Sequence, residues 1–337
     1  MSSTTFPRAA LALLMGTSAC ATWALPSQYH LTDLGPDSYA VHINASGVAS
    51  GTDSRFSVNA PALWVDGAVT DLASLDGWGS AEWVNASNVA SGYVETDSGF
   101  HAAVWSSTGV LTDIGAVVGG DFNTANAIND NGDCTIDDLY DGKAYLSPGC
   151  TGSGLVDLGS LGKGNTSAIA INANGQVAGA SNAKGGQRAY LYTNGQMKNL
   201  GVLTGYVRSD ARGLNGKGHV VGRCADADDK SIGYYWNGTK MLSVGTLGGK
   251  HSFAYGINYF DVIVGSAQNK QEIWRPFILD KGTKGSKMID LTTMIDSSGA
   301  GWSLVSALGI NNAGQIIVQG VVAGDNALRT AILTPLD

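Results

Sequence analysis

The chain has 337 residues and a formal net charge of −8, and only 14% of its residues are charged against 44% that are hydrophobic. No block of Lys or Arg interrupts this acidic balance, which argues against nucleic acid and against an anionic membrane surface as partners. Glycine is abundant (47 residues) and proline scarce (7) without a collagen-like period, a profile that favours many short strands joined by tight turns.

The N-terminus is predicted to be an export signal. Arg8 precedes the apolar run 9–16, and small residues follow it. We therefore take residues 1–24 as a signal peptide and residues 25–337 as one domain that is secreted or periplasmic. No stretch of 18 uninterrupted apolar residues predicts a transmembrane segment.

Three positions compete for the end of this signal. Small residues at the −3 and −1 positions are consistent with cleavage before Leu25 or before Thr22. A lipoprotein signal, in which Cys20 would carry the lipid, is the third interpretation. The free protein and the lipid-anchored protein both remain open at this point.

A five-residue pattern, Ala-x-x-(Ile/Val/Leu)-Asn, occurs seven times along the rest of the chain. Successive alanines are 41, 44, 43, 43, 43 and 53 residues apart, a regularity that indicates a structural repeat. The seven copies are residues 40–44, 81–85, 125–129, 168–172, 211–215, 254–258 and 307–311.

Each copy is followed by a tight turn. Five copies have Gly three residues after the Asn, whereas Asn88 and Asp261 take that place in the other two. Asn and Asp are the other residues that best tolerate a positive φ, so all seven copies predict the same turn. The leading Asn is expected to bond to its own turn as an Asx-turn, which is a structural role and not a ligand site.

Four short strands are predicted in each unit of about 42 residues, and this strand number and length are typical of a propeller blade. The fold class is therefore all-β, a seven-bladed β-propeller of four-stranded blades. The repeated Ala suits the innermost strand, where side chains have least room. The last unit ends after its third strand, and residues 29–35 match the missing fourth one. We expect this N-terminal strand to complete the last blade and close the ring.

The repeat resembles the HAF repeat of predicted extracellular bacterial proteins. The resemblance is carried by the Leu-Gly, Ala-x-x-Ile-Asn-x-x-Gly and Asp-Leu-Gly elements, with His101-Ala102 and Arg188-Ala189-Tyr190 at the namesake tripeptide. It covers residues 29–337, and it implies export and a propeller-like fold without implying a reaction. Most copies lack the full tripeptide, which indicates that it serves packing.

Three cysteines follow the signal. Cys134 and Cys150 lie on one predicted hairpin, so a disulfide between them is expected in an oxidising compartment. Cys224 is left over and is interpreted as a small buried hydrophobic residue.

Function is expected on one face of the propeller. The first-to-second and third-to-fourth turns are short and share one face, the short-turn face. The second-to-third loops and the links between blades vary and share the other, the variable-loop face, where functional residues usually lie.

Two acidic loops on the variable-loop face are candidate calcium sites, since Ca²⁺ takes several oxygen ligands. Neither loop matches the EF-hand pattern, and a solvated acidic loop is the alternative; no cofactor is required for the fold. The six candidate ligands are Asp137, Asp138, Asp141, Asp226, Asp228 and Asp229.

Aromatic and hydrogen-bonding side chains on the same face are candidates for stacking on a sugar ring, with ordinary packing as the alternative. They are Phe100, Tyr140, Arg188, Gln268 and Trp274.

Two functions follow from this pattern. The first is a secreted, non-catalytic binding module, expected to be a monomer, that contacts a glycan or a protein through the variable-loop face. The second is an extracellular propeller enzyme, a hydrolase or lyase acting on a polysaccharide or another polymer. No serine-hydrolase elbow, phosphate loop or zinc-protease motif occurs in the sequence, which favours the first.

Overall fold

The computed structural model describes residues 24–55, 58–75, 77–325 and 327–336. Residues 1–23, including Cys20, lie outside the described residues. Within the described part of the chain, no helix is both long and apolar enough to cross a membrane.

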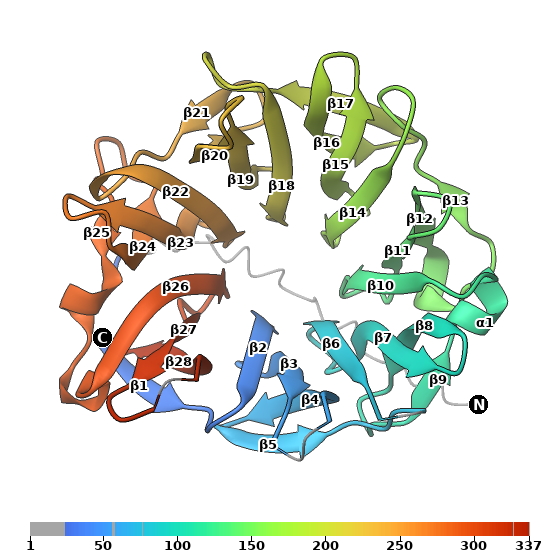
Figure 1. Ribbon diagram of the computed structural model, residues 1–337, viewed down its shortest axis with the longest axis horizontal. Helices are drawn as coiled ribbons and strands as arrows, with labels where there is room; N and C mark the ends of the chain where they lie inside the picture. The colour runs from blue at the N-terminus through green and yellow to red at the C-terminus, as the bar shows by residue number, and fades with distance from the viewer. Residues whose placement is uncertain (1–23, 56–57, 76, 326, 337) are drawn as a thin grey trace, which may run out of the picture.

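Seven four-stranded antiparallel sheets surround a common axis, which confirms the seven-bladed propeller (Figure 1). Blade one contains β2 (Ser38–Ile43), β3 (Ala49–Asp53), β4 (Ala60–Val65) and β5 (Ala68–Asp71). Blade two contains β6 (Gly79–Val84), β7 (Ala90–Thr96), β8 (Gly99–Trp105) and β9 (Leu111–Asp113). Blade three contains β10 (Asn123–Ile128), β11 (Cys134–Asp138), β12 (Lys143–Ser147) and β13 (Val156–Asp157). Blade four contains β14 (Thr166–Ile171), β15 (Val177–Ala183), β16 (Gly186–Thr193) and β17 (Gln196–Gly201).

The remaining blades follow the same order. Blade five contains β18 (Arg208–Leu214), β19 (Val220–Ala225), β20 (Ser231–Trp236) and β21 (Met241–Ser243). Blade six contains β22 (Gly248–Ile257), β23 (Val262–Asn269), β24 (Trp274–Asp280) and β25 (Ile289–Asp290). Blade seven contains β26 (Trp302–Ile310), β27 (Ile316–Val322), β28 (Arg329–Pro335) and β1 (Tyr29–Asp33). Short helical turns are α1 (Gly115–Val118), η1 (Pro148–Cys150), η2 (Leu291–Met294) and η3 (Ser297–Gly299).

The repeated alanine lies in the innermost strand of every blade, as Figure 1 shows for β2, β6, β10, β14, β18, β22 and β26. All seven alanines are at most 1% exposed. In blade two, Ala81 pairs with Gly92 of the second strand, and a Cβ on Gly92 would overlap the main-chain oxygen of Ser80. The inner strands therefore pack so closely that only small residues fit, which is the predicted reason for the Ala.

The turns after these strands have the predicted backbone. Asn88 and Asp261 have φ values of 59° and 67°, and the five glycines at the same place are also positive. In each turn the leading Asn accepts hydrogen bonds from main-chain N–H groups two and four residues later. The Asx-turn prediction is confirmed.

The same seven asparagines also join the blades, a role that the repeat pattern does not predict. Each side-chain amide donates to the main-chain oxygen of the corresponding Asn in the next blade, over 2.8–3.3 Å. We call this closed circle the asparagine ring: Asn44, Asn85, Asn129, Asn172, Asn215, Asn258 and Asn311. The donors are buried, so each blade is locked to its neighbour by a hydrogen bond shielded from water.

The N-terminal strand closes the ring as predicted. β1 pairs antiparallel with β28, with Tyr29 opposite Pro335 and Leu31 opposite Leu333. Tyr29 and Leu31 are 0% and 5% exposed, because they pack into the core of blade seven. The edge that β28 would otherwise present is thereby covered.

The cysteines of blade three are bonded. Cys134 begins β11, and Cys150 ends the helical turn η1 after β12. Their sulfurs form a disulfide with the Cα atoms 5.0 Å apart. Cys224 is a free, buried thiol, and burial raises its pKa to about 11.

Candidate functional site

A cavity of about 220 Å³ lies against blades five and six. Its lining residues come from β18, β19 and β22: Arg212, Arg223, Phe253, Ala254 and Tyr255. Two of these five are arginines and two are aromatic, a combination suited to binding. We call it the arginine–aromatic cavity.

One carboxylate holds both arginines in place. Asp210 is 9% exposed, and its two oxygens each accept a hydrogen bond from an Nε–H, one from Arg212 and one from Arg223, both at 2.8 Å. The Arg223 guanidinium carbon also lies 5.7 Å from the centre of the Phe253 ring. Two guanidinium groups share one carboxylate, so one positive charge is left uncompensated within this group of side chains.

Aromatic rings extend from this cavity toward the variable-loop face. The rings of Trp274 and Phe253 stack at 5.1 Å with an interplanar angle of 19°, and those of Phe253 and Tyr255 at 6.0 Å and 23°. His251 stacks on the outer side of the group, 6.3 Å from Trp274. Burial raises the pKa of Tyr255, so its hydroxyl stays neutral and can both donate and accept.

The structure brings two of the five predicted stacking residues to this group. Trp274 belongs to the stack and begins β24, and Gln268 of β23 lies opposite it in the sheet register. The Gln268 Oε1 is buried with no hydrogen-bond partner in the described part of the chain. Both residues lie in strands and not in the loop where they were predicted.

The other three predicted stacking residues lie elsewhere. Phe100 of blade two packs edge-on against Tyr93. Tyr140 of blade three is 86% exposed. Arg188 of blade four donates to three main-chain oxygens, two in its own loop and that of Val207 in the link to blade five, which is a structural role. These three do not form a common site.

Two of the three predicted calcium ligands of blade three, Asp137 and Asp138, lie in strand β11, and Asp141 follows the strand. Asp137 was predicted in a loop, but it belongs to β11 and is only 4% exposed. Its carboxylate accepts hydrogen bonds from the Ser167 hydroxyl at 2.5 Å and from the Ala168 N–H at 2.8 Å in blade four. Burial raises the pKa of Asp137 to about 6, although these hydrogen bonds by themselves would lower it. Asp137 thus connects two blades.

The neighbouring acidic residues hold their own loops. Asp138 accepts from the N–H groups of Tyr140 and Asp141, and Asp226 accepts from those of Asp228 and Lys230. Asp228 also pairs with Lys230 at the surface, and Asp229 pairs with Arg208. Within the described ranges, no three His, Cys, Asp or Glu side chains are grouped so as to hold a metal ion. Calcium at these loops stays a prediction.

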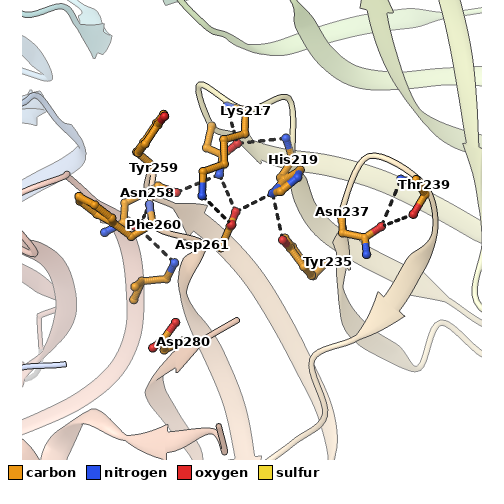
Figure 2. Close-up of polar contacts among 12 residues, drawn as sticks. Lys217, His219, Tyr235, Asn237, Thr239, Asn258, Tyr259, Phe260, Asp261 and Asp280 are labelled. Atoms are coloured by element: carbon orange, nitrogen blue, oxygen red, sulfur yellow. Dashed lines mark hydrogen bonds and ion pairs between the residues drawn. The ribbon is translucent and has the colours of Figure 1, made fainter. Parts of the chain in front are cut away.

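A polar cluster on the short-turn face centres on Asp261 (Figure 2). One carboxylate oxygen lies 2.6 Å from the His219 Nδ1 and also accepts from the Asn215 side chain at 2.9 Å. The other accepts from the Lys217 ammonium at 3.0 Å. The Tyr235 hydroxyl lies 3.0 Å from the same His219 nitrogen. Partial burial by itself would raise the pKa of Asp261, but the hydrogen bonds from His219 and Lys217 outweigh it and hold the pKa below its usual range.

This cluster explains one exception in the repeat. Asp261 replaces the turn Gly of blade six, and its carboxylate reaches back to three side chains of blade five. Asn88, the other exception, similarly accepts from the Asn44 side chain at 2.9 Å. Both exceptions therefore reinforce contacts between blades.

A second cavity of about 270 Å³ lies on the axis, at the asparagine ring. Every blade contributes to its lining, through the end of its innermost strand and the start of the following turn. This larger cavity is on the short-turn face, whereas we expected function on the variable-loop face alone.

No protein-family model matches the chain, and no curated protein matches it in sequence. The resemblance to the HAF repeat therefore stays a prediction. Among solved structures, a streptogramin B lyase superposes with a TM-score of 0.57 at 12% identity, covering 91% of this chain and 98% of the lyase. An acylaminoacyl peptidase from Pyrococcus horikoshii gives 0.56 at 11% identity, covering 89% of this chain and 50% of the peptidase. The β-propeller domain of the Trilobed protease from Pyrococcus furiosus gives 0.52 at 10%, covering 92% and 96%. At such identities the likeness shows the fold alone, which is a seven-bladed β-propeller.

Proposed function

We propose that the chain is a secreted, non-catalytic binding module that takes an acidic glycan in the arginine–aromatic cavity. The observation that carries this proposal is that Asp210 holds Arg212 and Arg223 together beside a stacked aromatic group. Export through residues 1–24 belongs to the same proposal.

The chemistry of the cavity favours an acidic sugar. A guanidinium presents several N–H donors in a planar fork, which matches the oxygens of a carboxylate or a sulfate. The Nε–H of each arginine is used by Asp210, so the remaining donors of both side chains are available to a ligand. Since Phe253 already stacks on Trp274 and Tyr255, the Tyr255 ring offers the apolar surface for the ring of a sugar.

The same lining favours binding over catalysis. Hydrolysis or elimination on a glycan needs a proton donor and a proton acceptor, in most glycosidases a pair of carboxylates. Neither a carboxylate nor a histidine is among the residues that line this cavity. Asp210 is not among the lining residues, and both of its oxygens already accept hydrogen bonds from the arginines.

The test is calorimetric titration with an oligosaccharide of uronic acids and with its neutral counterpart. We expect the acidic sugar to bind and the neutral one to bind at least tenfold more weakly, with affinity falling as salt is raised. Arg212→Gln should lower the affinity at least tenfold, which corresponds to about 1.4 kcal/mol. Arg208→Gln is the matched control, since Arg208 lies in the same strand but pairs with Asp229 at the exposed rim.

A second pair of variants tests the aromatic group. Trp274→Ala should weaken binding, whereas Trp78→Ala, which removes a 47% exposed tryptophan from blade two, should not. Equal binding of the acidic and neutral sugars, or an Arg212→Gln protein that binds normally, would contradict the proposal. Shortening of the oligosaccharide during the titration would instead support the enzyme hypothesis.

A further inference from the structure

The axial cavity on the short-turn face is bordered by the residue that follows each Asn of the asparagine ring. We call these the mouth residues, and all seven are exposed: Ala45, Ala86, Asp130, Ala173, Gly216, Tyr259 and Asn312. Each stands at the first position of its turn, where no strand partner takes its main-chain N–H. Whether each of these seven N–H groups already has a hydrogen-bond acceptor determines what the cavity can bind.

Two of the seven N–H groups are occupied by the protein itself. The N–H of Ala86 donates to the carboxylate of Asp130, and the N–H of Tyr259 donates to the side-chain oxygen of Asn312, both at 2.8 Å. In each pair the oxygen comes from the mouth residue of the next blade. The mouth N–H therefore points where a planar carboxylate or carboxamide group can reach it.

The other five N–H groups have no acceptor among the described residues, and the sequence explains why. For four of them the next mouth residue is Ala or Gly, which has no side-chain oxygen, and for Gly216 it is Tyr259, whose ring packs against Gly216. The five donors are those of Asn312, Ala45, Asp130, Ala173 and Gly216. Three of them, from blades three to five, follow one another around the mouth.

Two aromatic rings also line the cavity. The rings of His42 and Trp83 stack there at 3.8 Å. Burial lowers the pKa of His42 to about 3, so its imidazole is neutral at ordinary pH. Its Nδ1 accepts from the N–H of Val84 at 3.4 Å, which leaves the proton on Nε2.

We propose that this axial cavity binds a small organic carboxylate, held by the free main-chain N–H groups of the mouth. Main-chain N–H groups can bind an anion without any basic side chain. The two occupied positions show the chemistry directly, because Asp130 and Asn312 present the same planar oxygens that a ligand carboxylate would present. The site is separate from the arginine–aromatic cavity and does not depend on it.

The experiment is a titration of the ¹⁵N-labelled protein with benzoate, followed by amide chemical shifts, with benzyl alcohol as the neutral probe. We expect saturable shifts with benzoate at the N–H groups of Ala45, Asp130, Ala173, Gly216 and Asn312. Those of Ala86 and Tyr259, already bonded, should move less. Absence of saturable shifts, or equal shifts at all seven mouth residues, would overturn the proposal.

Two variants should act in opposite directions. Ala173→Asp copies the arrangement of Asp130 one blade further on, so its carboxylate should occupy the N–H of Asp130 and weaken benzoate binding at least fivefold. Asp130→Ala frees the N–H of Ala86 and should strengthen binding. Asn237→Asp is the control, since it adds the same charge on the same face in a turn away from the axis. An Ala173→Asp protein that binds as well as the control would contradict the assignment.

Discussion

The side-chain amide of Asn311 donates a hydrogen bond to the main-chain oxygen of Asn44, which lies 2.9 Å away and 267 residues earlier in the chain. This bond joins blade seven to blade one and completes the asparagine ring. The propeller is therefore closed twice, by the asparagine ring near the axis and by the pairing of β1 with β28 in blade seven. The Asn of each repeat thus bonds both to its own turn and to the next blade, and so holds the ring together.

Removing one member of this ring should destabilise the whole domain. In Asn85→Ala, two N–H groups of the turn lose their acceptor and the main-chain oxygen of Asn129 loses its donor. Since the Asn85 side chain and its bond to Asn129 are buried, we expect the free energy of unfolding to fall by about 2–4 kcal/mol. Urea denaturation measures it, with the exposed Ser87→Ala in the same turn as control. Equal stability of the two variants would contradict the role given to the ring.

The buried carboxyl of Asp137 should make stability depend on pH. Its pKa of about 6 in the folded protein lies above the value near 3.8 expected after unfolding, so the fold favours the protonated form. This contribution is complete below pH 4 and is lost as pH rises through 6. Relative to Asp137→Asn, the wild type should lose about 3 kcal/mol over that interval.

Denaturation curves at pH 4, 5, 6 and 7 test this dependence. Asp138→Asn is the matched control, because Asn can accept the same loop hydrogen bonds and the residue does not connect two blades. A difference between wild type and Asp137→Asn that does not change with pH would show that the carboxyl titrates normally.

The Asp261 cluster should have the opposite pH dependence. Because its pKa is held below the ordinary 3.8, the ionised carboxylate stabilises the fold above that pH, and the contribution disappears as pH falls through the folded value. Asp261→Asn tolerates the positive φ but removes the charge, and should cost about 1–3 kcal/mol at pH 7. The difference from wild type, measured by urea denaturation, should shrink as pH falls below 3.8. A difference that does not shrink there would rule out the ionised carboxylate as its source.

The disulfide of blade three should contribute measurably to stability. Cys134 and Cys150 are 16 residues apart, and closing a loop of this length stabilises the folded state by about 3 kcal/mol in the chain-entropy treatment. Reductant should therefore lower the urea midpoint of the wild type. The double variant Cys134→Ala, Cys150→Ala should start lower and show no response. A wild type unaffected by reductant would contradict a bonded pair.

The fold could be predicted from sequence because its signals are local and repeated. The Ala at the crowded inner strand, the Asx-turn and the strand at residues 29–35 each follow from the space or backbone available to a single residue. The donor role of the asparagines could not be predicted in the same way. It depends on the distance between neighbouring blades, which no single repeat contains.

The candidate site was harder to predict than the fold. Arg212 and Tyr255 both follow the repeated Ala directly, a position where every blade carries a different residue. Variation at that position was the available signal, whereas the repeated residues around it indicate only packing. Arg223 and Asp210 join the site only because two strands of blade five are paired. Trp274 was predicted for its chemistry, although its strand position and its stacking partners could not be.

The most direct test of the proposed function is a crystal structure of the protein grown with an oligosaccharide of uronic acids. We expect a sugar carboxylate bonded to the guanidinium groups of Arg212 and Arg223, with the sugar ring against Tyr255. A complex in which the sugar lies elsewhere on the variable-loop face, with this cavity empty, would contradict it.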